Sequence, residues 1–275
     1  MTTIASAPER ATLGRARRTG LTRSTLTVTR RSLLRYLRTP QLIVLATIQM
    51  SMFFLIYRYL FGGAFHFGTE PYVDYLVPGF IATGVLFSGI GTATAMAEDL
   101  EQGFIDRLRS LPIPRTAVLA ARALADTAIF AWSTAFTAAI AFAVGFRLHG
   151  TALDGLLAFG LVVLFGLAFE WLFVTMGLFA GNAQAAQGMG MIVFPFAFIS
   201  SAYVPVSTMP GWLQVFAAHQ PLTYMVGAVR GLTLGQDAHA VLGQPTSYFV
   251  VRALIWAAAI VAVSLPLAVW KYRRG

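Results

Sequence analysis

The sequence has no cysteine, a single lysine and few charged residues of either sign. The absence of cysteine excludes disulfides and thiolate metal sites. The one lysine, Lys271, is followed by Tyr272. A phosphate-binding loop needs its lysine directly after a glycine-rich turn, so that the ammonium group reaches the terminal phosphates of ATP. The chain therefore carries no ATP-hydrolysing site of that kind.

Motifs for hydrolytic enzymes are also missing. The sequence contains neither H-E-x-x-H nor G-x-S-x-G, which argues against an intramembrane protease or a transferase. The histidines number four, and all fall in segments predicted to face the outside: His66, His149, His219 and His239.

Apolar residues dominate the composition of the chain. They make up 57% of the chain, against 11% charged residues, which is typical of an integral membrane protein. A crossing needs about 20 mainly apolar residues. The candidate spans number six, at residues 41–61, 76–97, 115–146, 155–180, 189–204 and 249–270. The expected fold is an all-α polytopic membrane protein.

Positive charge is distributed unevenly among these spans. Sixteen of the twenty Lys and Arg residues precede the first span, lie in or around the charged segment that separates the second span from the third, or follow the last span. An even number of spans places all three groups on one side, and the positive-inside rule makes that side the cytoplasm. The net charge of +9 is therefore a topology signal and does not indicate nucleic-acid binding. Both termini are expected in the cytoplasm.

The first forty residues are rich in arginine and lack the apolar core and cleavage site of a signal peptide. Residues 1–23 are predicted to form a disordered cytoplasmic tail. Leucines and Tyr36 share one arc of a predicted helix over 24–39, with Arg31, Arg35 and Arg38 opposite, as in a helix at the membrane interface. Residues 40–273 then form the transmembrane domain.

A charged segment at 98–115 separates the second and third spans. Leu100, Phe104, Leu108 and Leu111 recur at helical spacing, and most of the charges lie away from that stripe. Pro112 and the next proline end the pattern. The segment predicts a short amphipathic helix at the membrane surface, which lies on lipid or fills a groove in a partner protein.

The fifth apolar run, 189–204, is short for a crossing and contains Pro195. Short helices are predicted to begin near Pro210 and at Pro221, and neither is long enough to span a bilayer. Irregular backbone at membrane depth has to be covered by protein or water, so this region is expected to line a bundle interior or an outer gate.

Polar and aromatic residues inside the spans are candidates for a substrate pathway. Glu170 is the clearest, because an ionisable side chain at membrane depth is costly, and the alternative, which the lack of a visible partner favours, is that it holds helices together by hydrogen bonding. Arg122 and Asp126 are spaced as a helical i,i+4 pair, which is interpreted as structural. The pathway candidates are Gln49, Phe53, Phe87, Glu170 and Tyr203, with interhelical bonding or packing as the alternative for the first three.

Three stretches together resemble the ABC-2-type exporter permeases of the daunorubicin-resistance kind. They are the segment Glu98-Asp-Leu-Glu-Gln-Gly-Phe-Ile-Asp-Arg-Leu-Arg-Ser-Leu-Pro-Ile-Pro-Arg-Thr-Ala-Val-Leu119, the segment Tyr203-Val-Pro-Val-Ser-Thr-Met-Pro-Gly-Trp212, and His219-Gln-Pro221 near Arg230-Gly231. The resemblance runs from about Arg30 to the C-terminus. Broader relatives often carry Gly-Thr where this chain has Gly103-Phe104, which favours the drug-exporter subgroup without fixing a substrate.

The resemblance implies six transmembrane helices, an N-terminal elbow helix, a cytoplasmic coupling helix and outer re-entrant helices between spans 5 and 6. It also implies two copies of a separate ATPase subunit that bind ATP and Mg²⁺, and a second permease subunit, identical or not, in a bacterial cytoplasmic membrane. The implied ATPase-coupling residues are Glu98, Asp99, Leu100, Glu101, Gly103, Phe104, Ile105, Asp106, Arg107, Leu108, Leu111 and Pro112. The implied outer gate comprises Pro205, Met209, Pro210, Trp212, His219 and Pro221.

The expected function is therefore export of a hydrophobic or amphiphilic compound, such as a drug, an antibiotic or a lipid. A polysaccharide or glycolipid exporter of the same fold is an alternative. An ion-coupled secondary transporter is a weaker one, because it would show matched broken helices in two halves and several buried carboxylates. The sequence has one broken region, no internal repeat and one buried acid. No cofactor is expected on this chain itself.

Overall fold

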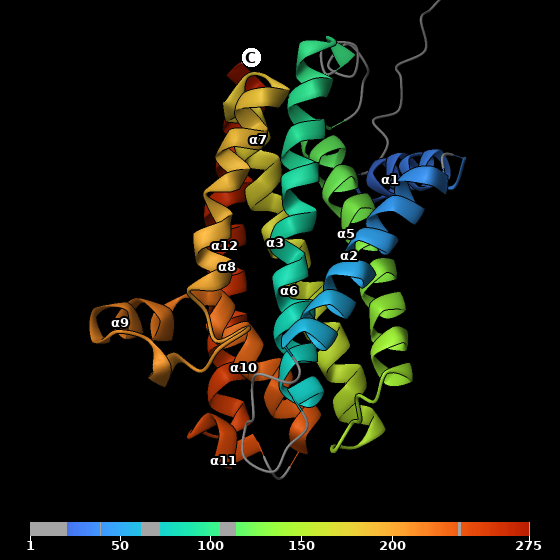
Figure 1. The fold of residues 1–275 in the computed structure, drawn as a ribbon. Helices are drawn as coiled ribbons and strands as arrows, with labels where there is room; N and C mark the ends of the chain where they lie inside the picture. Colours follow the sequence, from blue (N-terminus) through green and yellow to red (C-terminus); the bar gives the residue numbers. More distant parts are fainter. Residues whose placement is uncertain (1–20, 39, 62–71, 105–113, 236–237, 275) are drawn as a thin grey trace, which may run out of the picture.

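A computed structural model describes residues 21–38, 40–61, 72–104, 114–235 and 238–274, and these form helices and connecting turns without a β-strand. The long helices pack side by side into a bundle (Figure 1). The helices are α1 (Leu21–Arg38), α2 (Pro40–Phe61), α3 (Tyr72–Glu101), α5 (Arg115–Ala143), α6 (Ala152–Ala180), α7 (Ala183–Met191), α8 (Val193–Phe198), the 3₁₀ turn η1 (Val206–Thr208), α9 (Gly211–His219), α10 (Pro221–Leu234), α11 (Ala238–Leu242) and α12 (Thr246–Arg274).

Five of the described helices are long and apolar enough to cross a membrane: α2, α3, α5, α6 and α12. Each coincides with a predicted span. α3 and α6 are mostly buried, whereas α2 and α12 expose most of their apolar residues. Apolar side chains facing outward are expected where the surrounding solvent is lipid, because lipid tails are as apolar as the side chains.

The fifth predicted span differs from the prediction. The structure begins a helix earlier, at Ala183, interrupts it at Ile192 and ends it at Phe198. Pro195 supplies no backbone N–H, which accounts for part of the irregular hydrogen bonding here. The predicted span 189–204 therefore covers the end of α7, all of α8 and a loop, and a sixth crossing at this position stays a prediction.

Local signals fix the ends of α6 and the start of α7. Thr151 and Asp154 form a reciprocal capping box: the Asp154 backbone N–H donates to the Thr151 hydroxyl over 3.2 Å, and the Thr151 N–H donates to the Asp154 carboxylate over 2.8 Å. Gly181 ends α6 with φ +78°. Asn182 caps α7, since its side-chain oxygen accepts the Ala185 N–H over 2.7 Å.

α3 and α6 form the centre of the bundle, and glycine permits their close approach. A methyl group on Gly177 of α6 would lie 2.4 Å from the carbonyl oxygen of Ala93 on α3. A methyl group on Gly89 of α3 would lie 1.9 Å from the ring of Phe173 on α6. Larger residues at these positions would force the two helices apart, as is common for small residues between membrane helices.

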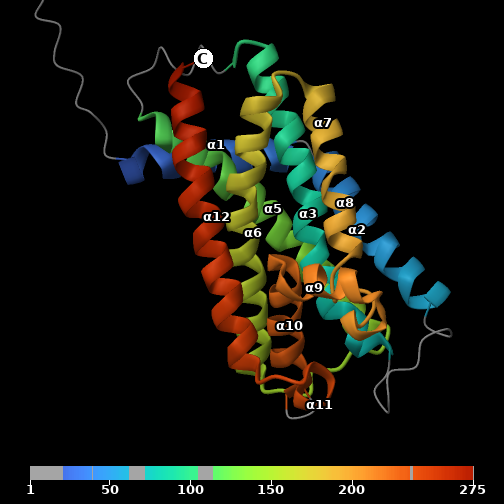
Figure 2. The ribbon, with the colours of Figure 1, turned by 90° about the vertical axis from the view of Figure 1, so that its left-hand side faces the viewer.

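Most of the lysine and arginine residues that the structure describes gather at one end of the bundle. α1, the end of α3, the start of α5 and the C-terminal end of α12 lie toward this end in both views (Figures 1 and 2). α11 and the α5–α6 connection lie at the opposite end, where the His149 backbone N–H donates to the Thr233 carbonyl over 2.9 Å. The arrangement agrees with the distribution of arginine in the sequence.

α1 lies across the long helices rather than along them (Figure 2). It packs on α5, and the Thr29 hydroxyl is 3.5 Å from the Ala121 carbonyl oxygen. The helix begins at Leu21, three residues before the predicted boundary, so the predicted tail 1–23 overlaps it. Residues 1–20 of that tail lie outside the described residues.

Candidate functional site

A cavity of about 510 Å³ lies among α2, α3, α5, α8 and the segment after α8. Its wall includes four of the five residues that the sequence marked as a substrate pathway: Gln49, Phe53, Phe87 and Tyr203. These residues come from α2, α3 and the loop after α8. Pockets of this volume bury most of a drug-sized molecule. Glu170 does not line the cavity itself.

One part of the cavity wall is aromatic. Tyr203 stacks on Tyr57 with ring centroids 4.9 Å apart and on Phe198 at 5.5 Å. The Tyr203 hydroxyl is 2.9 Å from the hydroxyl of Thr83, which fixes the ring against α3. Phe87 contacts Phe194 edge-on at 5.1 Å. Such rings offer large apolar faces to a ligand. We call this part, together with Phe53 and Phe80, the aromatic end.

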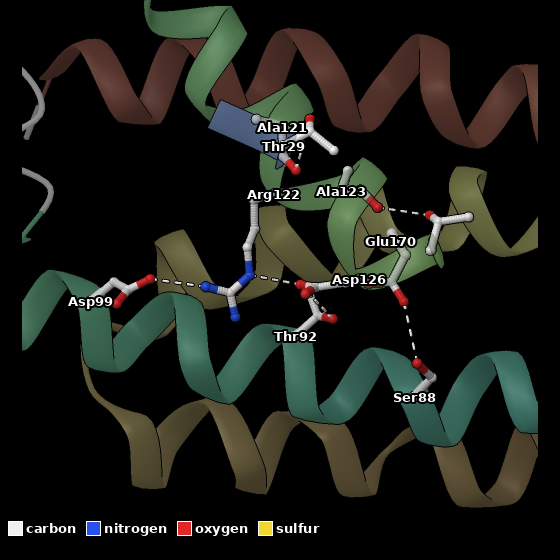
Figure 3. Close-up of polar contacts among 10 residues, drawn as sticks. Thr29, Ser88, Thr92, Asp99, Ala121, Arg122, Ala123, Asp126 and Glu170 are labelled. Atoms are coloured by element: carbon white, nitrogen blue, oxygen red, sulfur yellow. Dashed lines mark hydrogen bonds and ion pairs between the residues drawn. The ribbon is translucent and has the colours of Figure 1, made fainter. Parts of the chain in front are cut away.

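A charged network forms another part of the wall (Figure 3). Arg122 donates from Nε to Asp126 Oδ2 over 2.6 Å and from Nη1 to Asp99 Oδ2 over 2.9 Å. The Thr92 hydroxyl donates to Asp126 over 3.1 Å. The predicted i,i+4 pair of Arg122 and Asp126 is present. Asp99 is a further partner of Arg122, and this contact joins the last turn of α3 to α5. Thr92, Arg122, Asp126 and the neighbouring Ser88 line the cavity and are called its polar end.

Glu170 lies behind the polar end. Its side chain is 2% exposed, and the Ser88 hydroxyl donates to Oε1 over 3.4 Å. The other carboxylate oxygen, Oε2, is buried without a hydrogen bond. Figure 3 shows the Glu170 carboxylate reaching from α6 toward Ser88 on α3, near the side chain of Asp126. The structure thus gives Glu170 neighbours that the sequence did not reveal.

The predicted coupling segment is described only in part. Ile105, Asp106, Arg107, Leu108, Leu111 and Pro112 lie outside the described residues. Glu98 to Glu101 belong to the last turn of α3, and Gly103 follows with φ +63°. The expectation of one separate helix from residue 98 onward is therefore wrong at its start.

Leu100 corrects the predicted apolar stripe. It packs on the cluster of Met96, Leu119 and Trp171 inside the bundle, whereas Phe104 is exposed. The turn at Gly103 separates these two side chains, because α3 ends before a further helical turn could bring them onto one face. Glu98 is also exposed, and Glu101 accepts the Ala183 N–H over 3.3 Å at the start of α7.

The predicted gate residues cluster around η1 and α9. Pro205 precedes η1, Met209 follows it, Pro210 precedes α9, and Pro221 opens α10, so both predicted helix starts are confirmed. Trp212 is 77% exposed, which is unusual for tryptophan outside a lipid or protein interface. His219 contacts the Val215 carbonyl over 2.8 Å within α9. A gating role stays a prediction.

Sequence reasoning missed the importance of Arg230. It is 1% exposed on α10, and its Nη2 donates to the carbonyl oxygens of Tyr75 and Ser201 over 3.0 and 3.1 Å. Its guanidinium carbon lies 3.6 Å from the centre of the Tyr75 ring. An arginine within an otherwise apolar stretch was the available signal.

Comparison with known proteins agrees with this architecture. The sequence profile of the family described as "ABC-2 type transporter" matches residues 23–234. A daunorubicin resistance ABC transporter permease protein of Streptomyces coeruleorubidus is 31% identical over 272 residues, covering 98% of this chain and 92% of that protein. A protein of Mycobacterium tuberculosis named "Probable doxorubicin resistance ABC transporter permease protein" is 28% identical over 255 residues, covering 91% and 88%. The all-helical bundle, its membrane-length helices and these matches show that the chain belongs to the ABC-2 type transporter family.

Proposed function

We propose that the chain is the permease subunit of an ATP-driven exporter that moves a hydrophobic or amphiphilic compound out across the bacterial cytoplasmic membrane. The cavity of about 510 Å³ carries the proposal, because it joins an aromatic end to a polar end among membrane-length helices. The names of the two relatives support a drug or antibiotic as the compound. The cavity has the size and lining that such a molecule needs.

ATP is bound and hydrolysed elsewhere in this proposal. Two copies of a cytoplasmic ATPase subunit carry ATP and Mg²⁺ and contact the end of α3 and the residues that follow it. A second permease subunit, of this or a related sequence, completes the assembly. Asp99 supports such coupling, because its bond to Arg122 joins the end of α3 to the polar end of the cavity. A shift of this turn would reach the cavity wall directly.

The fifth crossing is proposed to be composite. α7 and α8 occupy the bundle from the end that holds the C-terminus to about its middle, and α10 continues toward the opposite end (Figure 1). α9 projects sideways between them, as a re-entrant segment would. Six crossings in total would put the arginine-rich end in the cytoplasm.

Transport into inverted membrane vesicles tests the proposed function. Vesicles holding the permease and its ATPase are expected to accumulate at least one of a set of fluorescent dansyl amides, positively charged and neutral, when ATP is added. Ala95→Trp places a large ring in the cavity and should abolish accumulation. Ala139→Trp adds the same ring to an exposed position on α5 and should leave it intact.

Accumulation without ATP, or in vesicles whose ATPase lacks its phosphate-binding lysine, would contradict an ATP-driven mechanism. Equal accumulation by the two tryptophan variants would show that the cavity is not the pathway.

A further inference from the structure

A second cavity, of about 330 Å³, lies between the start of α5 and the last turns of α12. Both of these helix ends lie at the arginine-rich end of the bundle (Figures 1 and 2). Among the described residues, it has none in common with the cavity described above. We call it the α5–α12 groove. The described residues that line it are Thr116 on α5 and Leu265, Pro266, Val269, Trp270 and Arg273 on α12.

The groove combines an apolar wall with two polar side chains. Leu265, Pro266 and Val269 form the apolar part. The two polar side chains are the guanidinium of Arg273 and the hydroxyl of Thr116, one from each helix. In the parts of the chain that the structure describes, neither of them forms an ion pair or a hydrogen bond. Both are therefore available to a ligand that accepts hydrogen bonds.

The other two basic residues in the last turn of α12 are directed elsewhere. The Lys271 ammonium lies 5.3 Å from the centre of the Phe179 ring on α6, and the Arg274 guanidinium lies 4.3 Å from the centre of the Trp270 ring. Neither lines the groove, and among its described lining residues there is no carboxylate. Arg273 thus gives the groove a positive charge, which an anionic ligand would complement.

The depth of the groove indicates what kind of molecule fits it. Leu265 and Arg273 are eight residues apart, which is about 12 Å along a helix. Both belong to α12, which is long and apolar enough to cross a membrane. A soluble protein subunit at the membrane surface would contact Arg273 but would not reach Leu265 and Pro266. A phospholipid has a polar headgroup and an apolar chain in this same order, so it can contact both ends of the groove.

We propose that the α5–α12 groove binds an anionic phospholipid from the leaflet at the arginine-rich end. The lipid phosphate accepts hydrogen bonds from Arg273 and Thr116, and the first part of an acyl chain packs on the three apolar residues. Trp270 lies between these two parts, as tryptophan commonly does at the level of lipid headgroups. A zwitterionic choline headgroup is less suitable, because it brings its own positive charge near Arg273. The bound lipid connects the first turn of α5 to the last turns of α12.

Titration of two phospholipids with identical acyl chains tests the inference. The full-length permease in complex with its ATPase is purified in detergent, and bound lipids are counted by native mass spectrometry. Phosphatidylglycerol is anionic, whereas phosphatidylcholine has no net charge. We expect the first phosphatidylglycerol on each permease to bind about tenfold more tightly than phosphatidylcholine, which corresponds to about 1.4 kcal/mol. Glycerophosphoglycerol, which is the headgroup without chains, should not compete at equal concentration.

Variants then locate the preference. An arginine near the surface contributes about fivefold to the binding of anionic lipid, so Arg273→Gln should reduce the preference to about twofold. Arg274→Gln removes the same charge from the same turn but from a residue outside the groove, and it should leave the preference nearly unchanged. Thr116→Val should weaken phosphatidylglycerol binding, and Thr116→Ser, which keeps the hydroxyl, should not.

Equal affinity of the wild-type complex for the two phospholipids, or retention of neither, would overturn the inference. Equal losses in Arg273→Gln and Arg274→Gln would overturn the site, because the preference would then reflect overall charge. Loss of the ATPase from the Arg273→Gln complex would overturn it as well, since the groove would then be a protein contact. None of these results would affect the proposed export function, which the vesicle assay tests through the other cavity.

Discussion

Arg230 illustrates how a single buried side chain can hold three segments together. It belongs to α10, and its guanidinium reaches the backbone of α3 at Tyr75 and of the loop after α8 at Ser201. Backbone carbonyls in a bilayer need internal donors, because water is absent there. Arg230 supplies such a donor to the Ser201 carbonyl, which lies outside any helix, and its guanidinium also covers the face of the Tyr75 ring.

Replacing Arg230 by methionine should therefore destabilise the protein. Hydrogen bonds from a charged donor contribute roughly 1.5–3 kcal/mol each, so the expected loss is about 3 kcal/mol or more. Thermal unfolding in detergent measures it. Arg147→Met is the matched control, because Arg147 also donates to two carbonyls, of Phe142 and Phe146, but in an exposed position. Similar melting temperatures for the two variants would contradict the role assigned to Arg230.

Contacts close in sequence were predictable at the residue scale, and distant ones were not. The Arg122–Asp126 pair follows from helical spacing alone. Asp99, the second partner of Arg122, lies 23 positions away on another helix, so the pattern gave no indication of it. The environment of Glu170 likewise depends on how α6 meets α3 and α5. Its burial was predictable from its place in an apolar run.

At the scale of helices, the five long apolar runs predicted their elements well, because continuous hydropathy over a membrane-length segment is a strong signal. The broken region was less predictable. Its helix starts at Pro210 and Pro221 were visible from proline and its neighbours. The earlier start at Ala183 was not, because that helix contains polar glutamines and small residues that carry little hydropathy signal.

The packing of α6 on α3 provides a second prediction. Gly177→Val should destabilise the protein by about 1–3 kcal/mol or more, because the added side chain would meet the Ala93 carbonyl oxygen and the Met96 side chain. Gly160→Val is the control on the same helix, since a methyl group placed there would meet no atom within 4 Å apart from its chain neighbours and its own helix backbone. Melting temperatures in detergent compare the pair. Equal losses would mean that helix propensity, rather than close packing, determines the effect.

The end of α3 provides a third prediction. Phe104 is exposed just beyond the turn at Gly103, so it is free to enter a groove on the ATPase subunit. Phe104→Asp would bury an unpaired charge in that contact, at a cost of several kcal/mol in binding. The variant should reach the membrane but lose co-purification with the ATPase and lose transport. Leu100→Ala should affect stability instead, because Leu100 packs inside the bundle.

Wild-type levels of ATPase binding and transport by Phe104→Asp would contradict the proposed contact. The exposed ring would then be better explained by contact with lipid at the membrane surface.

For the whole molecule, the distribution of arginine and the arrangement of helices predict one orientation, which stays a prediction. Among the residues that the structure describes, the end that gathers α1, the last turn of α3 and the end of α12 also holds most of the lysine and arginine. Anionic lipid and the insertion machinery both favour such an end in the cytoplasm. The sequence predicted this grouping, because an even number of spans places both termini and the charged segment on one side. In the structure, five continuous long helices and one broken segment bring these parts of the chain to the same end of the bundle.

Single cysteines test this orientation cleanly, because the chain has no cysteine of its own. Gln102→Cys and Arg274→Cys lie on exposed positions at the arginine-rich end, and Thr151→Cys lies at the opposite end. A membrane-impermeant maleimide added to intact cells should label Thr151→Cys alone, and permeabilised cells should show labelling of all three. If α7, α8 and α10 did not together complete a crossing, the two ends of the chain would face opposite sides. Arg274→Cys would then react in intact cells while Gln102→Cys stayed protected. Gln102→Cys therefore tests the orientation, and the comparison of Arg274→Cys with it tests the composite crossing.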